Sequence, residues 1–393
     1  TQSEPFHIGV SATGDVEFQH IALREADQLP LGNLCVQVLA TPGHTPEHIS
    51  FAVYGEKDAT PGALFSGGSL IVGGTGRPDL LGREHTIPLA RALYHTLHDK
   101  LAHLPDEVVV YPTHGAGSFC NTTSNGARFT TIGEERRTNP FFQLHDKETF
   151  VNRALTGLSN YPTYYQFMRK INQKGARVLG GVPLIRPLNP FDFQHELAHG
   201  AVALDIRPTS HFLAGHIPDS YGIPLVTPLV PWAGWVIPFG SPILLVGNTQ
   251  AELQEAVRQL IRIGYEDIRG YLDGGIEAWV KTDHVIKTTP SITATQLHDW
   301  KSQKDAPYVL DVRDDKEWNA GHIRGAKHIE GGLLPQLARD LLRTDRSLVV
   351  HCARGNRSTI AISVLERLGF TDLFALEDGL SAWKHAEYEL VAE

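Results

Sequence analysis

The chain has 393 residues, of which 41% are hydrophobic and 20% are charged, and its formal net charge is −9. That length favours two or three domains over a single core. The negative charge argues against nucleic acid as a partner, because a phosphate backbone requires a basic face. The three cysteines are too few for a disulfide framework, which favours a reducing, cytoplasmic compartment.

The first region, residues 1–138, alternates short apolar segments with glycine-rich turns. Residues 34–39 predict a strand, and the turn at residues 41–44 follows it. Because the region starts at Thr1 as though in the middle of a domain, we expect this amino-terminal domain to be incomplete.

Residues 139–182 are rich in aromatic side chains and predict a helical connector. Further on, residues 220–251 contain no charged residue, a length that could cross a bilayer. The stretch carries five prolines, however, and prolines leave helical carbonyls unpaired, which lipid does not tolerate. We therefore expect a buried loop that leads into a strand, with no membrane as a partner.

The last two regions, 183–285 and 290–393, form a repeat. An aspartate and a histidine stand eleven residues apart in both copies, at Asp205 and His216 and at Asp311 and His322. In each copy an apolar strand precedes a loop and an amphipathic helix. Alternating strands and helices predict two α/β domains in tandem, each with a central parallel sheet.

The loop after the strand at 348–350 carries the clearest chemistry. Cys352 stands directly outside the carboxyl end of that strand, where α/β sheets keep their ligands. The following backbone amides and the helix amino terminus favour anions and hence a thiolate. The pattern predicts Cys352 as a catalytic nucleophile; the alternative is a buried core thiol.

The rest of the loop is predicted to bind substrate, through residues Ala353, Arg354, Gly355, Asn356, Arg357 and Ser358. Arg354 and Arg357 supply fork-shaped donors for an oxyanion, and Gly355 permits a positive φ. Four residues separate Cys352 from Arg357. Cysteine phosphatases have five there, so the tighter loop favours a terminal sulfur atom on the cysteine over a phosphoryl group.

The carboxyl-terminal repeat resembles the rhodanese family, on Asp311–Arg313, Trp318, Gly321–Ile323, Cys352–Ser358 and Gly379–Trp383. The resemblance implies thiosulfate or a persulfide as donor, a Cys352 persulfide, a thiol or cyanide acceptor and no cofactor. Asp311, His322 and Trp383 are expected to fix strand ends and pack the domain.

The first repeat lacks the groups that this chemistry needs. A count back from the shared glycines Gly264 and Gly369 places Gly247 opposite Cys352. Thr249 falls opposite Arg354 and Glu252 opposite Arg357 in the same count. We expect this repeat to be an inactive rhodanese-like domain that serves as a scaffold or docking surface.

Four amino-terminal segments resemble the persulfide dioxygenase branch of the metallo-β-lactamase fold: Thr41–His48, Phe65–Leu70, Gly76–Asp79 and Tyr111–Gly115. The resemblance implies a partial αββα sandwich and Fe(II) or Zn(II), with His44 and His114 as metal ligands. Gly68 stands where that branch has a ligand aspartate, and the upstream His-x-His-x-Asp-His motif is absent from this sequence. We therefore expect a degenerate metal site, with His44 kept as a turn residue.

The favoured hypothesis is a sulfurtransferase that acts on small anionic sulfur substrates and thiol acceptors. One alternative places a metal-dependent persulfide dioxygenase, or a glyoxalase-II-like thioester hydrolase, in the amino-terminal domain. A second alternative is a non-catalytic sulfur carrier or sensor. The sequence leaves open whether copies of the chain form a homo-oligomer.

Overall fold

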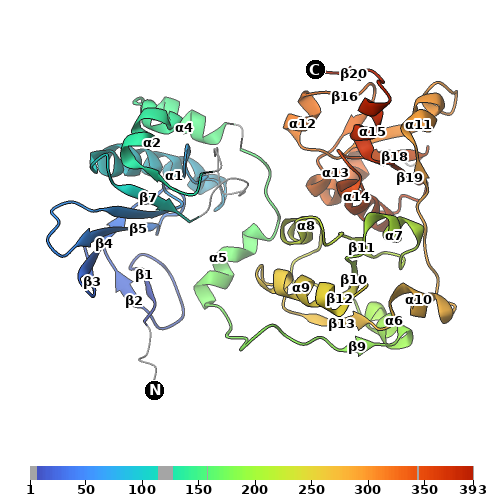
Figure 1. Cartoon of the computed structure of the whole chain (residues 1–393), viewed down its shortest axis with the longest axis horizontal. Helices are drawn as coiled ribbons and strands as arrows, with labels where there is room; N and C mark the ends of the chain where they lie inside the picture. Colours follow the sequence, from blue (N-terminus) through green and yellow to red (C-terminus); the bar gives the residue numbers. More distant parts are fainter. Residues whose placement is uncertain (1–6, 114–126, 157, 343–344, 393) are drawn as a thin grey trace. The chain divides into compact units, whose positions relative to one another are not determined.

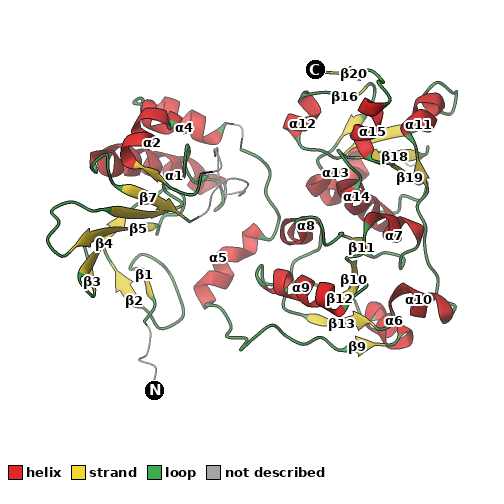
Figure 2. Cartoon of the chain, in the orientation of Figure 1, coloured by secondary structure: helices red, strands yellow, loops and turns green. Residues whose placement is uncertain are grey.

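The computed structural model describes residues 7–113, 127–156, 158–342 and 345–392 (Figures 1 and 2). The chain divides into two compact units. The first comprises residues 1–161 and 165–177, and the second comprises residues 162–164 and 178–393.

The first unit is built on a six-stranded sheet with the order β3-β4-β5-β6-β7-β8. Its strands are antiparallel except at β6 and β7, which run parallel. A separate pair, β1 (Gly9–Ser11) and β2 (Ile21–Leu23), is parallel. The strands of the main sheet are β3 (Gln28–Leu31), β4 (Leu34–Ala40), β5 (Ile49–Gly55), β6 (Ala63–Gly67), β7 (Val109–Pro112) and β8 (Thr130–Thr131).

Helices cover one face of this sheet, with α1, α2 and α4 on the same side (Figure 1). The helical segments of the unit are α1 (Arg83–His95), η1 (Thr96–Lys100), η2 (Leu101–His103), α2 (Ile132–Thr138), α3 (Pro140–Gln143), α4 (Lys147–Leu155) and α5 (Tyr165–Lys174).

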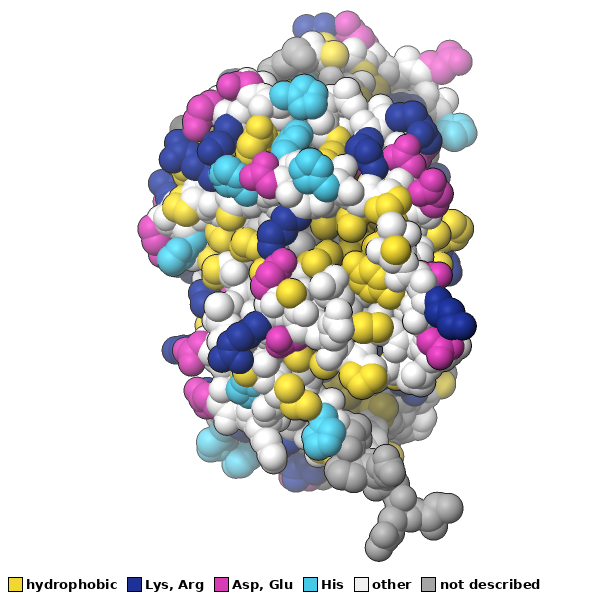
Figure 3. Space-filling view, turned by 90° about the vertical axis from the view of Figure 1, so that its left-hand side faces the viewer, with side chains coloured by type: hydrophobic (Ala, Val, Ile, Leu, Met, Phe, Trp, Pro, Cys, Tyr) yellow, Lys and Arg dark blue, Asp and Glu magenta, His cyan; other side chains and the backbone are white. Residues whose placement is uncertain are grey.

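The opposite face of the sheet carries exposed aromatic side chains. Phe65, Tyr111 and Phe129 are 50%, 41% and 61% exposed, and the rings of Phe65 and Tyr111 stack 5.4 Å apart. Hydrophobic side chains also gather in the middle of the surface shown in Figure 3. The described part of the unit thus supplies one sheet and one helical layer, as expected for a partial αββα sandwich.

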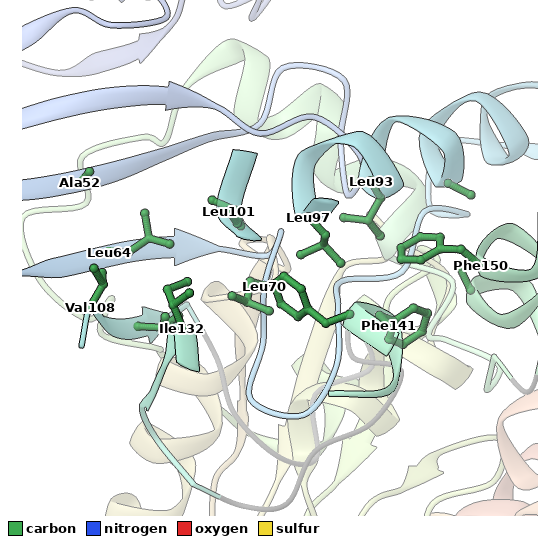
Figure 4. Close-up of a cluster of buried hydrophobic side chains, with 14 of the residues drawn as sticks. Ala52, Leu64, Leu70, Leu93, Leu97, Leu101, Val108, Ile132, Phe141 and Phe150 are labelled. Atoms are coloured by element: carbon green, nitrogen blue, oxygen red, sulfur yellow. The ribbon is translucent and has the colours of Figure 1, made fainter. Parts of the chain in front are cut away.

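The core lies between the sheet and its helices (Figure 4). Strand alternation turns Ala52 and Leu64 toward the helices, where both are fully buried. Phe141 of α3 and Phe150 of α4 fill the same cluster, with their rings 5.2 Å apart. The segment predicted as a connector, 139–182, therefore begins with helices that belong to this core, because their aromatic side chains bury large apolar surfaces there.

The second unit contains two five-stranded parallel sheets, with the orders β11-β10-β12-β13-β9 and β17-β15-β18-β19-β14. The two orders correspond strand by strand, which confirms the predicted fold of a repeated α/β domain. The strands are β9 (Pro187–Leu188), β10 (Val202–Asp205), β11 (Tyr221–Gly222), β12 (Ile243–Val246), β13 (Ile268–Leu272), β14 (Ser291–Ile292), β15 (Tyr308–Asp311), β17 (Lys327–His328), β18 (Leu348–His351) and β19 (Leu373–Leu376). A short antiparallel pair adds β16 (His322–Ile323) and β20 (Leu390–Val391).

Helices alternate with these strands in both repeats (Figure 2). Those of the first repeat are α6 (Pro190–Ala198), α7 (Thr209–Ala214), α8 (Leu229–Val236), α9 (Gln250–Ile261) and α10 (Gly275–Lys281). Those of the second are α11 (Ala294–Lys301), α12 (Asp315–Asn319), η3 (Gly331–Leu333), α13 (Leu334–Leu341), α14 (Asn356–Arg367) and α15 (Gly379–His385).

The charge-free stretch 220–251 differs in part from its prediction. It leads into the buried strand β12, as expected, but it also forms the helix α8. Pro231 lies in the first turn of α8, where a proline interrupts no helical hydrogen bond. Among the described residues, no helix is long and apolar enough to span a membrane.

Because Phe150 lies in the core of the first unit, we expect truncation of its side chain to lower the stability of the protein strongly. Its ring is fully buried, so Phe150→Ala leaves a cavity and should lower the free energy of unfolding by about 3–5 kcal/mol. Phe129→Ala is the matched control, since that ring is 61% exposed, and it should cost under about 1 kcal/mol. Urea unfolding of both variants measures the difference, and equal costs would contradict this packing.

Candidate active site

Cys352 directly follows β18, whose four residues are all buried. That strand lies between β15 and β19, so the cysteine stands at the carboxyl end of a central strand, as predicted. Helix α14 begins at Asn356, four residues further on. Cys352 is only 2% exposed, so a donor must present a small terminal atom to reach its sulfur.

Backbone geometry of the loop directs one amide at this sulfur. The N–H of Gly355 donates a hydrogen bond to Cys352 Sγ, with 3.1 Å between nitrogen and sulfur. Gly355 has φ of +99°, a left-handed conformation that favours glycine. Its carbonyl oxygen accepts from Ser358 Oγ at 2.6 Å, and that hydroxyl oxygen lies 4.0 Å from Cys352 Sγ. The loop therefore folds around the sulfur through its own peptide groups.

The beginning of α15 holds the loop from the other side. The N–H of Leu380 donates to the Cys352 carbonyl at 2.8 Å, and the N–H of Ser381 donates to the Ala353 carbonyl at 3.1 Å. Gly379, which precedes them, has φ of +54°. A β-carbon at Gly379 would collide with the Cys352 carbonyl, so only glycine permits this approach.

The two arginines of the loop differ in what they contact. The guanidinium of Arg357 donates two hydrogen bonds to the Glu317 carboxylate, at 2.6 and 2.7 Å. Burial opposes ionisation of both groups, but their pairing outweighs it: the pKa of Glu317 falls to about 2, and that of Arg357 rises. The Arg357 side chain thus anchors the loop to α12 through this ion pair.

Arg354, in contrast, is exposed and lines a cavity of about 580 Å³ beside α15. Thr293, Glu377 and His385 also line this cavity. The side chain of Asn356 accepts a hydrogen bond from Thr209 Oγ1 of the first repeat at 3.2 Å. Among the predicted substrate-binding residues, Arg354 is thus exposed beside the loop, whereas Asn356 is bonded to the first repeat.

Beneath the loop lies a buried polar group. The Arg313 guanidinium bonds the Asp311 carboxylate at 2.6 Å and the Gly321 carbonyl at 2.9 Å, which ties the strand end to the turn after α12. Burial opposes the charge on Asp311, yet the Arg313 bonds leave the pKa of Asp311 below its usual value. His351 is fully buried, 3.7 Å from Asp311, and burial lowers the pKa of His351. These residues brace the loop from below and do not contact the sulfur.

The corresponding place in the first repeat has no cysteine. Gly247 directly follows β12, as Cys352 follows β18. A β-carbon at Gly247 would lie 3.0 Å from Leu253 and 3.2 Å from Ile206, so a side chain there would require the ends of these side chains to shift. Glu252 caps α9 through a capping box with Thr249. This repeat keeps the strand, loop and helix without a nucleophile.

In the first unit, two histidines stand near the position of the expected metal site. His44 Nδ1 lies 2.9 Å from the Arg77 carbonyl. His48 Nε2 accepts from the Gly68 N–H at 2.9 Å, so its Nδ1 carries the proton and donates to Thr41 Oγ1 at 2.8 Å. Burial, together with the neighbouring His44, lowers the pKa of His48 to about 4. His48 is therefore a neutral turn residue with both nitrogens engaged.

The residues present do not fit the iron or zinc that the metallo-β-lactamase resemblance implies. Gly68 has no ligating side chain, and a β-carbon there would lie 2.6 Å from His44 Cδ2. The His44 ring thus occupies the space that an aspartate would need. His114 lies outside the described residues, and within the described ranges no three His, Cys, Asp or Glu side chains are grouped to hold a metal ion.

The comparison with known proteins agrees with this division of the chain. The family model of the rhodanese-like domain matches residues 191–282 and 293–386, one match in each repeat. A solved metallo-β-lactamase of Staphylococcus aureus subsp. aureus COL is 29% identical with a TM-score of 0.61, and the match covers 67% of this chain and 77% of that structure. The chain is a fusion of a metallo-β-lactamase fold with two rhodanese-like domains.

Curated relatives match shorter parts of the fusion. The mitochondrial persulfide dioxygenase ETHE1 of Mus musculus is 31% identical over 124 residues, which are 32% of this chain and 42% of that protein. The probable adenylyltransferase/sulfurtransferase MoeZ of Mycobacterium tuberculosis is 36% identical over 96 residues, or 24% of either chain. The chain thus spans less than half the length of these relatives.

Three contacts of the second rhodanese-like domain were not predicted from the sequence. Glu317 pairs with Arg357, the α15 amides hold the loop carbonyls, and Thr209 bonds Asn356 from the other domain. The spacing of Asp314 and Glu317 is typical of a capping box, which the structure also forms. That signal indicates a helix start and does not reveal a tertiary partner.

The Glu317–Arg357 pair predicts how the stability of the second rhodanese-like domain depends on pH. The folded-state pKa of Glu317 is lowered from 4.5 to about 2, so its contribution is fully present above pH 4.5 and is lost as the pH falls toward 2. The stability difference between the wild type and Glu317→Gln, measured by urea unfolding, should be constant above about pH 5 and shrink below it. Asp305→Asn removes an exposed carboxylate and serves as control. A difference that does not change down to pH 2 would refute the assignment.

Proposed function

We propose that this protein is a sulfurtransferase that moves sulfane sulfur from thiosulfate or a persulfide to a thiol or cyanide through Cys352. The observation that carries the proposal is the hydrogen bond from the Gly355 N–H to Cys352 Sγ at the end of β18. An N–H donor at this position can stabilise negative charge on the sulfur that forms and breaks bonds in sulfur transfer. The rhodanese-like family and the relative named as a probable sulfurtransferase support the general activity.

In the first half-reaction the Cys352 thiolate attacks the outer sulfur of thiosulfate. A new bond forms between Sγ and that sulfur, the sulfur–sulfur bond of thiosulfate breaks, and sulfite leaves with the electron pair. The exposed Arg354 supplies positive charge for the dianion at the mouth of the loop. The product on the protein is a Cys352 persulfide.

In the second half-reaction the acceptor thiolate or cyanide attacks the terminal sulfur of the persulfide. The bond between the two sulfur atoms breaks, and Cys352 regains its thiolate, ready for another cycle. The Gly355 N–H stabilises the negative charge that returns to Sγ. A phosphoryl substrate is disfavoured because only four residues separate Cys352 from Arg357, one fewer than in cysteine phosphatases.

The similarity to a persulfide dioxygenase favours a second candidate, a metal-dependent reaction in the first unit. The geometry around Gly68 and His44 does not fit a metal, so we derive no step there. A third candidate, a sulfur carrier or sensor, differs from an enzyme in its turnover: it would form one persulfide per chain and then stop.

Cys352→Ser should abolish thiocyanate formation from thiosulfate and cyanide, because a serine hydroxyl is not ionised at neutral pH and cannot hold a persulfide. Cys35→Ser is the matched control, since Cys35 lies on β4 in the other unit, and it should keep wild-type activity. The colorimetric thiocyanate assay under multiple turnover decides between the outcomes. Substantial activity in Cys352→Ser would remove the proposal, and a single turnover in the wild type would favour the carrier.

Arg354→Ala should raise the KM for thiosulfate by about 10- to 100-fold, the effect of losing one hydrogen bond to a charged group. The fold should be unaffected, because this side chain is exposed. Arg339→Ala removes an exposed arginine from α13 and should leave KM unchanged. Steady-state kinetics over a range of thiosulfate concentrations test this role, and equal KM values for the two variants would exclude it.

A further inference from the structure

Helix α14, which follows the cysteine loop, is covered by the cysteine-free repeat. It packs against α7 and β11 of that repeat, and its residues 358–365 are all buried. At the carboxyl end of α14, His216 Nε2 lies 2.8 Å from the Glu366 carboxylate, and the Arg367 guanidinium lies 4.3 Å from the centre of the Tyr221 ring. The first repeat therefore covers the helix that follows the reactive loop.

At the amino end of α14, Thr209 of the first repeat contacts the first turn of the helix. Thr209, the first residue of α7, donates from Oγ1 to Asn356 Oδ1 at 3.2 Å. The same oxygen accepts from Thr359 Oγ1 at 3.0 Å. Thr359 is 1% exposed, so this hydroxyl pair is shielded from competing water. One threonine thus holds two residues in the first turn of α14.

These contacts continue to the sulfur. The Gly355 carbonyl accepts from the Thr359 N–H at 3.2 Å, and Thr359 Oγ1, whose proton goes to Thr209, lies at the same distance from it. The N–H of Gly355 is the group that donates to Cys352 Sγ. This N–H and the Gly355 carbonyl belong to neighbouring peptide planes that meet at the Gly355 α-carbon. Hydrogen bonds to the first turn of α14, together with the backbone of Gly355, therefore connect Thr209 with Cys352.

We propose that Thr209 is a positioning residue for the Cys352 loop, so that the cysteine-free repeat takes part in sulfur transfer by orienting the donor to the sulfur. The proposal rests on the proposed function of Cys352. Thr209 touches neither substrate nor sulfur. It acts through Asn356 and Thr359, which border the Gly355 peptide.

If Thr209 only stabilised the packing of the two repeats, its loss should act like the loss of any other contact to α14. Thr289 provides such a contact for comparison. Thr289 also joins the preceding segment to α14, since its Oγ1 lies 3.3 Å from the Glu366 carboxylate. This contact is at the far end of the helix, about 15 Å from the loop at 1.5 Å per residue. Thr289 is 5% exposed. Loss of its hydroxyl should therefore disturb the packing at least as severely as loss of the Thr209 hydroxyl does.

The test compares Thr209→Val, Thr209→Ser and Thr289→Val in the full chain. Thr209→Val should lower kcat/KM for thiosulfate about three- to tenfold, the effect of one lost hydrogen bond. It should also slow iodoacetamide alkylation of Cys352 at a fixed pH, because the Gly355 N–H is no longer held in line with Sγ. Thr209→Ser keeps the hydroxyl and should restore both values. Thr289→Val should change stability without changing either value.

Peptide mass spectrometry of iodoacetamide labelling at Cys352 over time gives the alkylation rate, and urea unfolding gives stability. Equal effects of Thr209→Val and Thr289→Val on kcat/KM, or failure of Thr209→Ser to restore activity, would overturn the positioning role. Absence of thiocyanate formation by the wild type would instead overturn the proposed function. The two failures are thus distinguishable.

Discussion

The proposed chemistry depends on the hydrogen bond from the Gly355 N–H to Cys352 Sγ. This bond exists only because the loop turns sharply, with Gly355 in the left-handed region and Gly379 close against the Cys352 carbonyl. The strand β18 below and the first turn of α15 beside it hold the backbone in that shape. The site is thus made mainly of peptide groups, and side chains such as Arg357 act on it by anchoring the loop.

Local sequence patterns were sufficient to predict the repeat and the position of Cys352 at the end of a central strand. The apolar run before Cys352, the glycine in the loop and the amphipathic helix after it each have a fixed local meaning. Partners that are distant in sequence could not be predicted: nothing near Arg357 indicates Glu317, and nothing near Asn356 indicates Thr209. Likewise, the aromatic residues around Phe141 suggested a helical connector, and only the packing of Phe150 places that segment in the first core.

The two rhodanese-like domains differ at the position of the reactive cysteine. One keeps a cysteine in its loop, whereas the other has Gly247 at the same position. The second arrangement cannot hold a persulfide, but it preserves the surfaces that cover α14. The metallo-β-lactamase fold likewise lacks a ligating side chain at Gly68, where the His44 ring occupies the space that an aspartate would need. The tandem repeat thus keeps a cysteine in the loop of its second domain only.

The most direct test of this account is peptide mass spectrometry of the full chain after brief exposure to thiosulfate. The account predicts one added sulfur atom on Cys352, none on Cys35, and loss of the added sulfur when cyanide is supplied. Turnover of thiosulfate without sulfur on Cys352, or with sulfur on another cysteine alone, would contradict it.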